Sequence, residues 1–180
     1  MTSRFGGIST FGHGSDQPSS EIGAEGYMPS VKKQTDMVTQ LFKEIQSAFP
    51  HLEMKLGTNH PKVDLSMDIP KQKGLKFDIH LNLQGDELHL VARHFWLEWF
   101  PCTDKDVVKA FREAVHGVLS GEFRILEYYR GRRPVKAELQ QPSGDAWKTI
   151  GTWSKLSLPF PSGVTTKELR NAPGVESENV

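Results

Sequence analysis

The chain has 180 residues, 37% hydrophobic and 24% charged, which is the composition of an ordinary globular domain and excludes a chain disordered throughout. Its 22 basic and 22 acidic residues cancel, so the total charge gives no support for a duplex nucleic-acid binder. A single cysteine, Cys102, excludes an internal disulfide and suits a reducing compartment.

The two ends of the chain are predicted to be flexible tails. Residues 1–29 alternate glycine and serine with isolated aromatic residues, and residues 161–180 carry only scattered apolar ones, so neither offsets the entropy of ordering. A single domain is therefore expected over residues 30–160. No apolar run approaches the roughly 20 residues that span a bilayer, and the N-terminus lacks the apolar segment of a secretory signal. The expected location is the cytoplasm, without membrane contact.

Two amphipathic helices are predicted. The first covers about 30–49, with apolar residues at three- and four-residue spacings and Pro50 at its end, although two lysines in the first turn favour a start nearer Thr35. The second begins after Thr103, read as its N-cap, and ends at Gly121.

Apolar and polar residues alternate between the helices, which predicts a sheet with one buried face. Short polar or glycine-bearing turns separate the segments and favour antiparallel hairpins. The predicted strands cover residues 51–56, 62–69, 77–83 and 87–100 before the second helix, and two or three segments over 122–130, 134–140 and 146–158 after it.

The fold class is therefore α+β: a meander of about four antiparallel strands, two or three later strands, and two helices packed on one face. The order is α-β-β-β-β-α-β-β, with one further optional strand. This order resembles that of small bacterial chaperones for secreted effectors and that of immunity proteins that neutralise toxins. The resemblance covers only the element order of the central domain, implies protein binding, and carries over no site residue.

The hairpin around Gly85-Asp86 can be registered from the sequence. A two-residue turn there places Leu83 opposite Leu88 on the apolar face. It gathers four ionisable residues on the other face, with opposite charges facing each other at the hairpin's far end. These residues are Asp78, His80, His89 and Arg93. They are the candidate for an enzyme or small-ligand cleft, and the alternative is a solvated face with a cross-strand salt bridge.

The run 94–100 is apolar on both faces if residues 87–100 form one strand. That strand would direct Trp96 and Phe100 to the core and Phe95, Leu97 and Trp99 outward. Something must then cover the outward aromatic surface. The later strands, with Trp147 and Trp153, would do so within the chain, whereas a partner protein or a second copy would make it an interface.

A basic segment follows the second helix. Tyr128 stands beside Arg130, Arg132, Arg133 and Lys136, and aromatic residues among basic ones can bind single-stranded nucleic acid. A charged β-turn explains the pattern equally well, and the neutral total charge disfavours nucleic acid. Tyr128 and the three arginines are therefore assigned to the protein-binding surface.

Catalytic and metal motifs are not evident. Cys102 precedes a helix N-terminus, where a thiol pKa can fall, but packing at a junction is the simpler interpretation. His80 and His89 can approach each other, yet no third ligand is apparent, so no metal and no cofactor are predicted. We expect a non-enzymatic adaptor, chaperone-like or immunity-like, that binds a protein partner or itself, with a small molecule as the alternative ligand.

Overall fold

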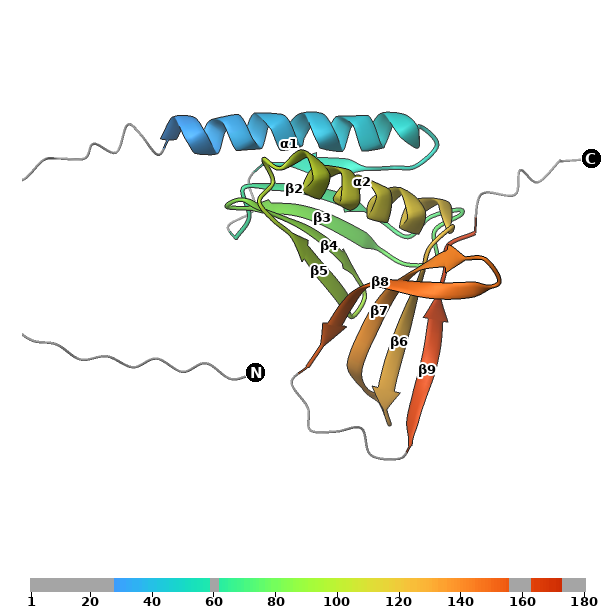
Figure 1. Cartoon of the computed structure of the whole chain (residues 1–180). Coiled ribbons are helices and arrows are strands. Elements are labelled where there is room, and N and C mark those ends of the chain that lie inside the picture. The colour runs from blue at the N-terminus through green and yellow to red at the C-terminus, as the bar shows by residue number, and fades with distance from the viewer. Residues whose placement is uncertain (1–27, 59–61, 156–162, 173–180) are drawn as a thin grey trace, which may run out of the picture.

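The computed structural model describes residues 28–58, 62–155 and 163–172 (Figure 1). Within them it has two helices and nine strands, which confirms the α+β class and the predicted order of helix, meander, helix and later strands. The first half comprises α1 (Met28–Ala48), β1 (Lys55–Gly57), β2 (Leu65–Ile69), β3 (Ile79–Gln84), β4 (Glu87–Ala92) and β5 (Phe95–Trp99). The second half comprises α2 (Lys105–Ser120), β6 (Arg124–Arg130), β7 (Arg133–Ser143), β8 (Ala146–Ser154) and β9 (Val164–Leu169).

The strands form two antiparallel sheets. The first is the meander β1-β2-β3-β4-β5, and the second has the order β8-β7-β6-β9. The later strands thus build a sheet of their own instead of extending the first one. β5 and β8 are edge strands of their sheets, and they lie near each other where the two sheets meet.

Both helices cover the same face of the first sheet (Figure 1). Their apolar stripes meet at Phe42 and Phe111, whose rings stack with centroids 6.4 Å apart. The α2 N-cap is Asp104, one residue after the predicted Thr103, and its carboxylate accepts from the backbone N–H of Asp106 and Val107. Gly121 ends the helix in the left-handed conformation, as predicted.

The predicted hairpin at Gly85-Asp86 is confirmed over the whole of β3 and β4. Leu83 pairs with Leu88, Leu81 with Leu90, and Ile79 with Ala92. The apolar residues of this register are fully buried under the helices. Each of the buried leucine and isoleucine side chains contributes roughly 1.5–3 kcal/mol on burial, so the hairpin is a large part of the core.

The predicted fourth strand is wrong, because it is two strands joined by a turn at Arg93-His94. Arg93 has φ 55°, and the chain reverses so that Leu97 pairs with Leu90 and Trp99 with Leu88. The reversal exchanges the two faces of the run. Phe95 is fully buried, and Leu97 and Trp99 are half-buried against the core, contrary to the outward face predicted for them. Trp96 and Phe100, predicted to be core, are instead 44% and 65% exposed.

Part of the predicted C-terminal tail is also structured. β9 pairs with β6 along its full length. Beyond it, the Asn171 side chain is buried, donates to the Val118 carbonyl and accepts from the backbone N–H of Lys76, at 2.9 Å each. Polar contacts therefore order a segment whose composition predicted a tail.

The predicted N-terminal tail lies outside the described residues except for 28 and 29, with which α1 begins. A single domain over 30–160 stays a prediction. Neither described helix has the length and apolar character needed to cross a bilayer.

Candidate functional site

An open groove of about 360 Å³ lies between the edges of the two sheets. Its walls are Trp96, Leu97 and Glu98 from β5 and Thr152, Trp153 and Ser154 from β8. A Cβ on Gly151 of β8 would stand only 2.3 Å from Leu97 Cδ2, so a larger residue at this position would have to displace the Leu97 side chain. Leu97 therefore touches β8 at Gly151 and also lines the groove.

Large aromatic side chains surround the groove. Trp96 is the most exposed large apolar residue on its walls, and Phe100 follows at the end of β5. On the opposite wall Trp153 is half-buried against the core, with Lys155 Nζ 6.0 Å from the centre of its ring. Exposed aromatic residues beside a fixed one are typical of binding surfaces.

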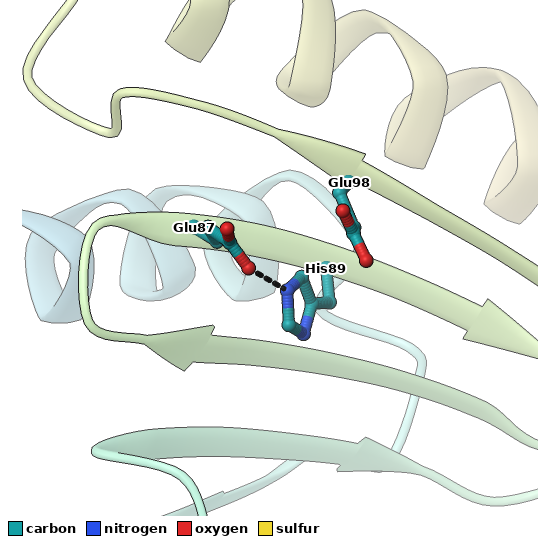
Figure 2. A group of neighbouring side chains, drawn as sticks. All are labelled: Glu87, His89 and Glu98. Atoms are coloured by element: carbon teal, nitrogen blue, oxygen red, sulfur yellow. Dashed lines mark hydrogen bonds and ion pairs between the residues drawn. The ribbon is translucent and has the colours of Figure 1, made fainter. Parts of the chain in front are cut away.

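A polar cluster adjoins the groove through Glu98 (Figure 2). Glu87 and His89 belong to β4, and Glu98 pairs directly with His89 across the β4–β5 ladder. The His89 side chain is only 5% exposed, its Nε2 lies 3.3 Å from Glu87 Oε2, and the Trp96 ring packs against it edge-on at 5.5 Å. One donor atom from each residue lies within 4.8 Å of the other two.

The other members of the predicted polar cleft have separate partners. Asp78 accepts from the backbone N–H of Lys71 at 2.8 Å, and His80 Nδ1 lies 2.7 Å from Asp68. β3 and β4 stop pairing before Asp78 and Arg93, and the Arg93 guanidinium lies 3.9 Å from Glu127 instead. His89 is buried, in contrast to the solvated position predicted for it.

The carboxylate of Glu127 holds the second sheet against the β4–β5 turn. It is fully buried and accepts from the Tyr129 hydroxyl at 2.6 Å, from the His94 backbone N–H at 3.3 Å, and interacts with His94 Nδ1 at 3.2 Å. Burial, together with the hydrogen bond to Glu127, raises the pKa of Tyr129. This junction connects β6 of the second sheet to the turn that precedes β5.

The predicted basic segment divides into two environments. The Tyr128 hydroxyl donates to Glu138 at 2.9 Å, and burial followed by this hydrogen bond raises the Tyr128 pKa. Arg130, Arg132 and Arg133 are exposed at the β6–β7 turn and do not line the groove. Their assignment to a binding surface, and the nucleic-acid alternative, stay predictions.

Cys102 is buried, and burial raises the pKa of its thiol, which opposes a nucleophilic role. The groove residues that sequence reasoning missed are mainly Glu98, Thr152 and Ser154. A turn assigned at Arg93-His94 would have placed Glu98 beside His89, but no local signal joins β5 to β8. Comparisons with models of known protein families, with curated proteins and with solved structures found no match, so the interpretation of the site rests on its own geometry.

Proposed function

We propose that the protein is a protein-binding module that holds an extended segment of a partner along β5, with an aromatic or large aliphatic side chain between Trp96 and Trp153. The observation that carries the proposal is the exposure of Trp96 on an edge strand that forms one wall of a groove. Trp96 thus replaces Phe95 and Trp99, which pack inward, as the centre of the contact surface, while Leu97 packs on the core and lines the groove.

The backbone of β5 supplies the first part of the argument. β5 pairs with β4 on one side, and the two-residue turn places Phe95 opposite Ala92. In such a hairpin, alternate residues hydrogen-bond to the neighbouring strand, so we expect the N–H and C=O groups of Trp96 and Glu98 to point away from β4. An unpaired strand edge is a template for another extended chain.

The walls of the groove supply the second part. Its volume of about 360 Å³ suits one large side chain better than a whole folded surface. Trp96 and Trp153 offer apolar area on opposite sides, and both walls belong to strands paired within their own sheets. A preformed groove loses little conformational entropy on binding, which favours affinity from a short contact.

A displayed library of random 12-residue peptides, selected against the untagged full-length chain, tests the proposal. Trp96→Ala should weaken the selected peptides by about 30-fold or more, the size of a hot-spot truncation of about 2 kcal/mol. Amide shifts on titration with one selected peptide should centre on Trp96, Glu98 and the 152–154 segment.

Ile150→Ala is the matched control, because Ile150 is an exposed apolar residue of β8 that does not line the groove. It should leave peptide affinity within about twofold. Amide shifts centred on the β6–β7 turn, or an equal loss of peptide affinity in both variants, would contradict the groove as the binding site. A concentration-dependent dimer lost in Trp96→Ala would identify a second copy, and not a foreign segment, as the occupant.

A further inference from the structure

The cluster of Glu87, His89 and Glu98 lies on the face of the first sheet opposite the helices (Figure 2). We propose that these three side chains bind one transition-metal ion of the Zn²⁺ class through His89 Nε2 and one carboxylate oxygen of each glutamate. The inference goes beyond the proposed peptide binding, because it concerns a metal site beside the groove and does not depend on any partner.

The distances between donor atoms are those of a site close to its bound geometry. Ligands at about 2.1 Å from Zn²⁺ in a tetrahedron stand about 3.4 Å apart. His89 Nε2 and Glu87 Oε2 are 3.3 Å apart, longer than the roughly 2.7–2.9 Å of a strong charge-assisted hydrogen bond. Glu98 is exposed, so rotation of its side chain alone can bring its oxygen from within 4.8 Å to ligand distance.

The imidazole is held in place before any ion arrives. His89 is the buried member of the cluster, and the Trp96 ring packs edge-on against it. His89 pairs opposite Glu98 in the β4–β5 ladder and lies two residues after Glu87 on β4. The regular β3–β4–β5 meander therefore places all three side chains on one face of the sheet. A donor fixed on rigid strands reduces the cost of assembling the site.

The negative charges of the two glutamates in the cluster also favour a bound cation. Glu87 and Glu98 bring two carboxylates together, and among the described residues Glu98 has no hydrogen bond or ion pair of its own. A divalent ion would cancel both charges with His89 neutral. The ring nitrogen favours Zn²⁺ or Co²⁺ over Mg²⁺ and Ca²⁺, which prefer oxygen ligands throughout.

Three protein ligands leave a fourth position open to water or to a donor atom from a bound molecule. Glu98 belongs both to the cluster and to the groove wall, so the ion would lie beside the groove. A metal here would also connect β4 to the edge strand β5. Bound metal should therefore raise the melting temperature by mass action.

Calorimetric titration of ZnCl₂ into the full-length chain, with any affinity tag removed, tests the site. One ion should bind per chain and raise the melting temperature. Co²⁺ bound at the same site should give the visible absorption bands of a low coordination number. Glu98→Gln removes one ligand at an exposed position and should weaken Zn²⁺ by at least about 10-fold, the lower end of the loss for supporting groups around metals. Circular dichroism should show its fold unchanged.

The matched control is His80→Ala, which removes the other histidine–carboxylate pair of the same sheet face. It should leave Zn²⁺ affinity within about twofold. Absence of saturable Zn²⁺ uptake, a Glu98→Gln titration equal to the wild type, or loss of binding in His80→Ala would each overturn the site. No peptide is present in these titrations, so a chain that selects peptides but takes up no Zn²⁺ contradicts this inference alone.

Discussion

The two sheets are stabilised by different means. The first sheet turns one face to two helices, and its buried side chains there are almost all aliphatic or aromatic. The second sheet adds Ile125, Ala137 and Leu139 to the same core on one side. Among its buried side chains are also Glu127, Glu138 and Gln140, whose polar atoms are hydrogen-bonded.

This difference explains why the groove lies between the sheets. An apolar core specifies the first sheet through packing, whereas the second depends on matched polar partners that also fix its position against the β4–β5 turn. The Glu127 carboxylate reaches across to His94 and Arg93 in that turn. The groove walls thus combine β5, whose inner face packs on the core, with β8, which packs on the core through Trp153 and joins the Glu138–Gln140 hydrogen bonds through Thr149.

The largest expected loss of stability comes from the inward face of β5 and distinguishes it from the outward face. Trp99 packs edge-on against Phe111 at 5.4 Å, below α2. Trp99→Glu should lower the free energy of unfolding by about 4 kcal/mol or more, because it removes a large core side chain and places a carboxylate there. Urea unfolding followed by circular dichroism measures the loss, which is comparable with the whole stability of a marginal domain.

Trp96→Glu is the partner experiment, three residues earlier on the opposite face. Trp96 is 44% exposed and lies on the face away from the core, so the loss should be about 1 kcal/mol or less. Equal destabilisation by the two variants would show that both faces of β5 are core, and would remove the exposed wall on which the peptide proposal depends.

The pair also shows where sequence reasoning succeeded and failed. Gly85-Asp86 announces a tight turn, since glycine tolerates positive φ, and the β3–β4 register followed from it. Arg93 adopts φ 55° without being glycine, asparagine or aspartate. Because no local signal marks a turn, the sequence predicts one strand over 87–100. Missing the two-residue turn then assigns every later residue of the run to the wrong face of the sheet.

Contacts between distant segments limited the prediction of the site. Strand periodicity identified the segments of β6, β7 and β8, but it does not say which edge meets which. The β9 sequence is mostly polar, and Leu169 alone is buried, so its pairing with β6 was not visible in composition. The approach of Gly151 to Leu97, beside the groove, depends on both sheets being in place.

A smaller loss of stability is expected from Glu138, in the hydrogen-bonded second sheet. Glu138 accepts from Tyr128 and Gln140 and pairs with Lys136. Burial alone would raise its pKa, but these hydrogen bonds and the Lys136 charge outweigh burial, so the Glu138 pKa is lowered. Because the Glu138 pKa is lower in the folded state, ionised Glu138 stabilises the fold at pH values above the ordinary carboxyl pKa. This contribution is lost as the pH falls through the pKa that Glu138 has in the folded state.

Glu138→Gln should therefore lower the free energy of unfolding at pH 7 by about 1–3 kcal/mol. The gap to the wild type should begin to shrink as the pH falls below about 5, where unfolded carboxyls start to take up protons. Urea unfolding across pH measures both. Glu113→Gln, at an exposed position of α2 that pairs loosely with Lys109, should show neither effect. A gap independent of pH would mean that Glu138 stabilises by packing alone.

The smallest effect should come from a charge pair in the helix layer. Arg112 Nη2 of α2 lies 2.9 Å from Glu44 Oε2 of α1, and both side chains are nearly half-exposed. The pair connects the same helices as the Phe42–Phe111 stack, yet water screens it and two long side chains lose freedom to form it. Glu44→Gln should change the free energy of unfolding by no more than about 1 kcal/mol, and by still less in 1 M salt. If it costs more than Glu138→Gln at pH 7, polar contacts govern the helix layer as well, and the contrast between a packed sheet and a hydrogen-bonded one is wrong.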